Sequence, residues 1–125
     1  MGVFSIDADV KGLPDSAGFV PVRGLLVDSG SELTWLPSGA LARAGVVVSK
    51  RGERFVTADG REIVRDVGYA LLRCGAFETV DEVVFGLPGD LSLLGARTLE
   101  GFGARVDARE KRLVASGPHL VAACA

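Results

Sequence analysis

The sequence predicts an all-β domain that carries one or two short helices. Glycine is abundant, with 17 residues in a chain of 125, and it recurs between short apolar runs, which is typical of many short strands joined by tight turns. Hydrophobic residues make up 48% of the chain and charged residues 24%, a balance that fits one compact globular core. Because no linker, low-complexity tract or internal repeat interrupts the pattern, we expect a single domain over residues 1–125.

Seven stretches are expected to form strands, because each is a short apolar or alternating run bounded by turn-forming residues. Between the third and fourth, the pair Asp59-Gly60 readily takes the positive φ angles of a tight turn, which predicts a protruding hairpin. The end of the chain, residues 116–125, could form either a strand or a loose tail. In chain order the expected strands are residues 2–10, 19–28, 54–57, 62–72, 79–85, 104–107 and 111–115.

Two segments break this pattern and predict short helices. In residues 36–45, Pro37 stands near the start, alanine and leucine fill the middle, and Gly45 closes the segment. Residues 94–101 end on a glycine in the same way. Neither segment is long enough to organise a helical bundle.

Composition also bears on the class of partner. A formal net charge of -2 and a pI near 5.4, with no run of arginine or lysine, give no positive surface for a phosphate backbone, so we expect no nucleic-acid partner. No stretch approaches the roughly 20 apolar residues of a membrane span, so we expect no membrane insertion. The first residues lack the features of a signal peptide, and we expect a cytoplasmic location.

The sequence does not indicate metal or cofactor chemistry. Cys74 and Cys124 are the only cysteines and His119 is the only histidine, too few for a cysteine/histidine zinc site or a disulfide framework. We therefore expect reduced thiols that serve in packing, with no metal and no cofactor.

Asp28 stands where a carboxylate is unusual. The apolar run 23–27 leads directly into it, and Ser29-Gly30-Ser31 then turns the chain away. Burying a lone ionised carboxylate is costly, so an acid in this place needs hydrogen-bond donors or a partner. The Ser29 and Ser31 hydroxyls and the amides around Gly30 are the nearest donors. The alternative is that Asp28 merely opens a turn, as such strings do in unrelated proteins.

Four segments in a fixed order widen the pattern beyond Asp28. They are Leu-Leu-Val-Asp-Ser-Gly-Ser at 25–31, Glu-Leu-Thr-Trp-Leu-Pro at 32–37, Thr-Ala-Asp-Gly-Arg at 57–61 and Leu-Leu-Gly-Ala at 93–96. In this order and spacing the sequence resembles the retropepsin-like aspartic proteases, particularly the small single-domain bacterial forms related to retroviral proteases. The resemblance covers most of the chain.

The resemblance implies a closed barrel-like acid-protease fold with a flap hairpin that closes over a peptide substrate. Asp28 would be catalytic, and Ala58, Asp59 and Gly60 would form the substrate-binding flap tip. Retroviral flaps are glycine-rich, whereas this tip carries charge, so Asp59 could also be a plain turn residue. In the family, a water between two aspartates attacks the peptide bond.

The number of such aspartates predicts the assembly. A two-lobed pepsin-like enzyme carries two copies in one polypeptide, whereas this chain has one, so an identical second chain would complete the site in a homodimer. By resemblance, Ser29 would hydrogen-bond across the two-fold axis and Gly30 would permit close approach. Ser31 would lie beside the carboxylates.

Two other functions are compatible with parts of the pattern. The first is a catalytically idle dimeric module of the same fold that binds peptides without cutting them. The second is a serine hydrolase that uses Ser29 or Ser31, but the sequence lacks a Gly-x-Ser-x-Gly elbow and its one histidine, His119, lies near the chain end.

Overall fold

The computed structural model describes residues 4–14 and 18–120, and within them the chain is mostly β, as the composition predicts. The strands are β1 Ser5–Gly12, β2 Val20–Val27, β3 Thr34–Pro37, β4 Val48–Val56, β5 Glu62–Cys74, β6 Phe77–Gly86, β7 Leu93–Leu94, β8 Ala104–Asp107 and β9 Arg112–Ala115. The helices are α1 Ser38–Arg43 and α2 Ala96–Phe102. Neither helix of this described part is long enough to cross a membrane.

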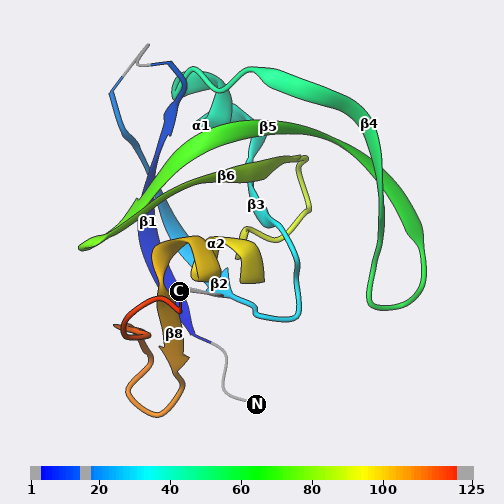
Figure 1. Ribbon diagram of the computed structural model, residues 1–125. Helices are drawn as coiled ribbons and strands as arrows, with labels where there is room; N and C mark the ends of the chain where they lie inside the picture. The colour runs from blue at the N-terminus through cyan, green and yellow to red at the C-terminus, as the bar shows by residue number, and fades with distance from the viewer. Residues whose placement is uncertain (1–3, 15–17, 121–125) are drawn as a thin grey trace, which may run out of the picture.

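Seven of the strands form one mixed sheet in the order β1-β2-β7-β3-β6-β5-β4, and β8 pairs with β9 separately. β2 with β7 and β3 with β6 are parallel pairs, whereas the other pairs in the sheet are antiparallel. Because β1 also pairs with β5, the pairings run from β1 round to β5 and back to β1. The sheet is therefore partly ring-like, and β4 lies outside the ring as an edge (Figure 1).

The core fills the inside of this curved sheet. Its largest fully buried side chains come from five different elements and belong to one contiguous cluster. Close packing of this kind fixes the relative positions of the strand ends, because even one extra methylene in a packed core is felt. These side chains are Leu25, Leu36, Leu41, Leu72 and Leu94.

The hairpin of β4 and β5 projects beyond the sheet. β5 pairs with both β4 and β6 at Val67, but over residues 62–66 it pairs with β4 alone. We call the two-stranded part, residues 51–66, the arm. In Figure 1 the arm (green) arches away, and its tip reaches the same side of the molecule as the loop between β2 and β3 (cyan).

The elements predicted from sequence are largely present, with two differences. β3 and β7 were not expected, because Leu36–Pro37 of β3 and Leu94 of β7 fall in the segments that the sequence pattern predicts as helices. β4 begins at Val48 rather than at residue 54, since its charged, mostly exposed residues hide the strand pattern. Residues 116–120 form no strand; residues 2–3 and 121–125 of the predicted elements lie outside the described part of the chain.

Candidate active site

The loop that joins β2 to β3, residues 28–33, carries the candidate residues, and we call it the Asp28 loop. β2 and β3 do not pair with one another, because β7 lies between them, parallel to β2 and antiparallel to β3. The Asp28 N–H donates to the carbonyl oxygen of Leu94, the last residue of β7, at 2.9 Å. Asp28 is thus held against the middle strand of this three-strand unit.

The Asp28 carboxylate is oriented by its own loop. Its Oδ1 accepts a hydrogen bond from the Gly30 N–H at 2.9 Å, and the Ser31 N–H donates to the Asp28 carbonyl oxygen at 3.1 Å. A Cβ at Gly30 would lie 3.2 Å from Oδ1, so the absence of a side chain there lets the loop close tightly. The side chain is half-buried, and Oδ2 makes no hydrogen bond within residues 4–14 and 18–120, which leaves one oxygen available for a ligand.

The two serines of the loop have different environments. Ser29 is exposed, and its hydroxyl makes no hydrogen bond to the part of the chain that the structure describes. The Ser31 hydroxyl instead donates to the carbonyl oxygen of Leu33 at 2.8 Å. The single hydroxyl proton of Ser31 is therefore directed away from Asp28, while Ser29 is free to contact another molecule.

The start of α2 holds the far side of the loop. The Ala96 N–H donates to the Ser31 carbonyl oxygen at 2.7 Å, and the Arg97 N–H donates to the Glu32 carbonyl oxygen at 3.1 Å. The first N–H groups of a helix have no partner inside the helix, and here two of them bond to the loop. β7 and α2 therefore hold the loop at both of its ends.

A buried chain of hydroxyls lies beneath this junction. The Gly95 N–H donates to Thr34 Oγ1 at 2.9 Å, Thr34 Oγ1 lies 2.6 Å from Thr98 Oγ1, and Thr98 donates to Asp81 Oδ2 at 3.0 Å. An ionised carboxylate only accepts hydrogen bonds, so Thr98 donates its one hydroxyl proton to Asp81. Thr98 Oγ1 must then accept the hydrogen bond from Thr34. Both threonines are fully buried, so the chain joins the turn at Gly95, between β7 and α2, to β3, α2 and β6.

Sequence reasoning did not identify these supporting residues. Thr34 and Thr98 are 64 positions apart, and Thr98 and Asp81 are 17 apart. A threonine in a strand or helix has no local feature that marks it as a hydrogen-bonding partner at such a distance. Only the folded chain brings them together.

The predicted flap residues lie at the tip of the arm, where Ala58, Asp59 and Gly60 are all exposed. Gly60 takes φ +85°, and the Gly60 N–H donates to the Thr57 carbonyl oxygen at 2.9 Å, so the predicted tight turn is present. Hydrogen bonds from the Thr57 hydroxyl and the Arg61 N–H lower the pKa of Asp59. Asp59 thus stays ionised into acidic pH, and its hydrogen bonds stabilise the turn.

The arm packs on β3 through aromatic and charged side chains. The Trp35 ring lies edge-on to Phe55, with centroids 5.2 Å apart, and the Arg65 guanidinium lies 6.0 Å from the Trp35 centroid. Arg65 also binds Asp90 of the loop before β7 with two hydrogen bonds of 2.7 and 2.8 Å. Trp35 is thus a packing residue that joins β3 to the arm.

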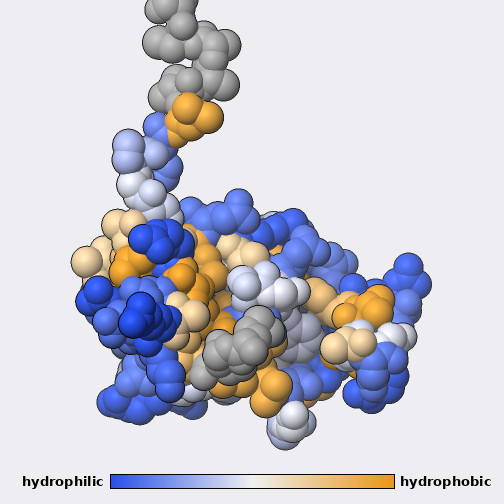
Figure 2. Space-filling model, turned by 90° about the horizontal axis from the view of Figure 1, so that it is seen from below, coloured by the Kyte–Doolittle hydropathy of each residue, from blue (hydrophilic) through white to orange (hydrophobic). Residues whose placement is uncertain are grey.

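The face that carries the arm tip and the Asp28 loop is shown in Figure 2. Apolar and charged side chains are interspersed there, and apolar groups are exposed both on the body and on the projecting arm. Val56 beside the arm tip is 72% exposed, and Leu91 beside β7 is 66% exposed. Single exposed apolar side chains are common on protein surfaces, so these two residues do not by themselves mark an interface.

Two surface pockets, of about 300 and about 220 Å³, lie beside the loop of residues 87–92 and share Ser38 and Leu87, but neither is lined by Asp28. A site completed by a second copy of the chain would not be enclosed by one copy. The position of these pockets therefore does not exclude Asp28 as the candidate active-site residue.

The other reactive side chains of the described residues form no second site. Burial raises the pKa of the half-buried Cys74 thiol, which disfavours the nucleophilic thiolate. His119 lies beside Gly103 and is exposed, and no hydrogen bond joins it to Ser29 or Ser31. Among the described residues, no group of three or more His, Cys, Asp or Glu is arranged to hold a metal ion.

The arrangement offers an oriented carboxylate whose Oδ2 accepts no hydrogen bond from the described residues, on a loop that is held by β7 and α2. The tip of the projecting arm reaches the same side of the molecule (Figure 1). This chemistry suits a water molecule or a polar ligand that accepts and donates protons. No protein-family model, curated protein or solved structure matches this chain.

Proposed function

We propose that this chain is a retropepsin-like aspartic endopeptidase that works as a homodimer, with Asp28 of each subunit forming the catalytic pair. The observation that carries the proposal is the Asp28 carboxylate itself. It follows β2, whose residues Leu25 and Val27 are buried, is oriented by the Gly30 N–H at 2.9 Å, and keeps one oxygen unpaired in the described chain. A carboxylate that only opens a turn needs neither a loop held at both ends nor a hydroxyl chain behind it.

The strand arrangement supports the same fold. A ring of pairings from β1 round to β5 is what a closed barrel-like domain requires, and the projecting arm is suited to act as a flap. An extended peptide would lie between the arm and the Asp28 loop and pair with the arm backbone as an added strand.

Two-fold pairing would place the second carboxylate beside the first. Two neighbouring carboxylates resist both being ionised, so the pair shares one proton. The exposed Ser29 hydroxyl, which has no partner in the described chain, would bond across the axis. No metal or cofactor is needed in this scheme.

The reaction then runs through general acid–base catalysis. The ionised aspartate takes a proton from the water as its oxygen attacks the peptide carbonyl carbon, and the protonated aspartate hydrogen-bonds the carbonyl oxygen. The tetrahedral intermediate collapses, the C–N bond breaks, and a proton passes to the leaving nitrogen. Identical residues thus act as base and acid in one cycle.

The direct test compares wild type with Asp28→Asn for cleavage of a denatured protein mixture from acidic to neutral pH, with the mass of each in solution. We expect a dimeric wild type that cleaves and a still-dimeric variant whose activity falls at least about a thousandfold, because the variant removes the shared base. Glu78→Gln, which removes an exposed carboxylate on β6, is the matched control and should retain activity.

Two results would count against the proposal. If Asp28→Asn cleaves as well as wild type, Asp28 is not catalytic. If a folded, dimeric wild type cleaves nothing at any pH, the same fold is better interpreted as a peptide-binding module.

A further inference from the structure

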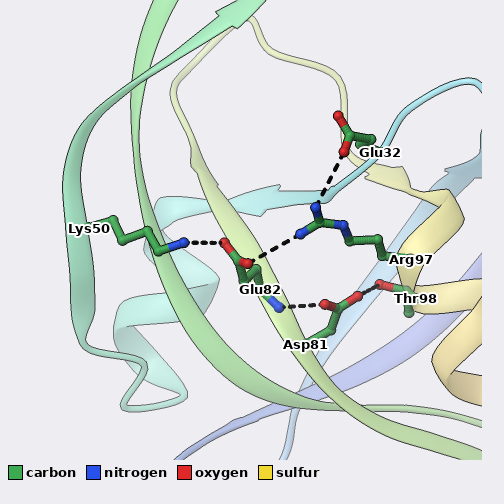
Figure 3. A network of polar contacts seen from close by, with 6 residues as sticks. All are labelled: Glu32, Lys50, Asp81, Glu82, Arg97 and Thr98. Carbon is green, nitrogen blue, oxygen red and sulfur yellow. Dashed lines mark hydrogen bonds and ion pairs between the residues drawn. The ribbon is translucent and has the colours of Figure 1, made fainter.

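A chain of four charged side chains links the base of the arm to the Asp28 loop. Lys50 on β4 binds Glu82 on β6, Glu82 binds Arg97 on α2, and Arg97 binds Glu32 in the loop (Figure 3). The N–O distances are 3.0, 3.2 and 3.4 Å in that order. Positive and negative groups alternate along the chain, so each contact is attractive.

Lys50 lies where the arm leaves the sheet. It is paired with Val67, and Val67 is the last residue along β5, toward the arm, that also pairs with β6. Beyond it the register of β4 shifts between Lys50 and Glu53, and Gly52 takes φ +68°. A two-stranded ribbon is only marginally stable alone, so contacts at its base set its direction.

Glu82 is the centre of the chain and its least exposed member. Its side chain is 21% exposed, and its two oxygens bind different cations, Oε2 to Lys50 and Oε1 to Arg97. Its hydrogen bond and charge raise the pKa of Lys50. Neutralising Glu82 would therefore release both cations at once.

Arg97 reaches the loop in two ways. Its backbone N–H donates to the Glu32 carbonyl oxygen at 3.1 Å, and its guanidinium binds the Glu32 carboxylate at 3.4 Å. Glu32 is four residues after Asp28, so a shift of Arg97 moves the loop that carries the carboxylate. Isolated exposed ion pairs contribute little, but a network whose members share partners loses less side-chain entropy for each contact.

We propose that Glu82 is a positioning residue that couples the base of the arm to the Asp28 loop through Lys50 and Arg97. This inference rests on the proposed function for its effect on catalysis, but the coupling itself is a property of the fold. The Lys50 branch holds the arm and so governs peptide binding. The Arg97 branch holds the loop and so governs the chemical step.

The experiment compares Glu82→Gln, Lys50→Met, Arg97→Met and the Lys50→Met/Arg97→Met double variant with wild type, for kcat, KM and amide hydrogen exchange. Lys50→Met should raise KM about threefold with kcat nearly unchanged, and Arg97→Met should lower kcat about threefold. Glu82→Gln should do both. Adding Glu82→Gln to the double variant should change kcat and KM little further, because both cations that the Glu82 carboxylate binds are then already removed.

The matched control is Asp9→Asn. Asp9 on β1 binds Arg73 at 3.3 Å, and the two side chains are 37% and 41% exposed. Asp9 pairs with Pro21, at the end of β2 that is far from Asp28. This variant should leave kcat and KM unchanged. In Glu82→Gln, hydrogen exchange should accelerate in the arm and in the Asp28 loop together, and in Asp9→Asn it should accelerate in neither.

The exchange measurement separates this inference from the proposed function, because it does not require activity. If the wild type cleaves nothing but Glu82→Gln speeds exchange in both the arm and the Asp28 loop, the coupling is supported and the proposed protease function is rejected. An active protein in which Glu82→Gln leaves exchange, kcat and KM as in wild type would overturn the coupling alone. So would a variant that loses only thermal stability.

Discussion

The chain turns from β7 into α2 at Gly95, where it passes against the backbone of the Asp28 loop. A Cβ at this position would lie 2.4 Å from the Leu33 carbonyl oxygen and 2.9 Å from that of Ser31. Neither neighbour is a flexible side chain that could move aside. Glycine is required here because the backbone of the Asp28 loop passes so close that any side chain at position 95 would displace it.

Gly95→Ala should therefore displace the Asp28 loop. We expect the free energy of unfolding to fall by about 2–3 kcal/mol, as for other overpacked sites, and cleavage to fall more than stability alone explains. Chemical denaturation and peptide cleavage measure the two effects. Gly18→Ala, where an added Cβ meets nothing within 4 Å, is the control; equal behaviour of the two variants would contradict the close-approach argument.

Among the elements, the loop of residues 87–92 joins β6 to β7 and depends on one ion pair. Asp90 accepts two hydrogen bonds from Arg65 and one from the Leu87 N–H at 2.8 Å. The side chains of the pair are only 15% and 17% exposed, so solvent screens them weakly. The pair ties this loop to β5 at the base of the arm, beside the Trp35 ring.

This pair makes stability depend on pH in one direction. The Arg65 hydrogen bond, with that of the Leu87 N–H, lowers the pKa of Asp90 below its ordinary 3.8 in the folded state. A lowered carboxyl pKa stabilises the fold above the ordinary value, and the contribution is lost as pH falls through the folded pKa. The pair is therefore intact at neutral pH and is lost only in strong acid.

Asp90→Asn should lower the free energy of unfolding by about 1.5–3 kcal/mol at neutral pH, because it removes a charged hydrogen-bond acceptor that is mostly buried. The difference from wild type should narrow below the ordinary Asp pKa, where wild type loses the same charge. Urea denaturation at a series of pH values measures it. A difference that stays constant into strong acid would show that the Asp90 charge is not responsible.

At the scale of the whole molecule, the proposal requires two chains. One copy presents an oriented Asp28 and an exposed Ser29 hydroxyl on a face where apolar groups are also open (Figure 2). The chain mass is 13.0 kDa, and a dimer would have twice that mass. Activity would then depend on how much of the protein is paired.

Cleavage per chain should therefore fall on dilution, with a midpoint that matches the dimer dissociation measured by sedimentation. Ser29→Ala should move that midpoint to about tenfold higher concentration, because it removes one bond across the axis from each chain. Ser49→Ala, on an exposed serine near the start of β4, should not move it. Activity per chain that is independent of dilution, from a protein that sediments as a monomer, would exclude the shared site.

Local patterns were sufficient for much of the fold and for part of the site. Apolar runs bounded by glycine predicted most strands, Pro37 and Gly45 predicted α1, and Asp59-Gly60 predicted the turn at the arm tip. Asp28 could be chosen as the candidate residue because a carboxylate directly after an apolar run is unusual in any fold. Each of these signals is contained within a few neighbouring residues.

The supporting contacts came only from the tertiary structure. β3 and β7 overlap the segments that local pattern predicts as helices, and their place in the sheet is set by pairing with strands distant in sequence. The hydroxyl chain through Thr34 and Thr98 and the charge chain through Glu82 join residues from four different elements. A sequence determines which residues are favourable to bury or to pair. Which partners they contact depends on how the whole core packs.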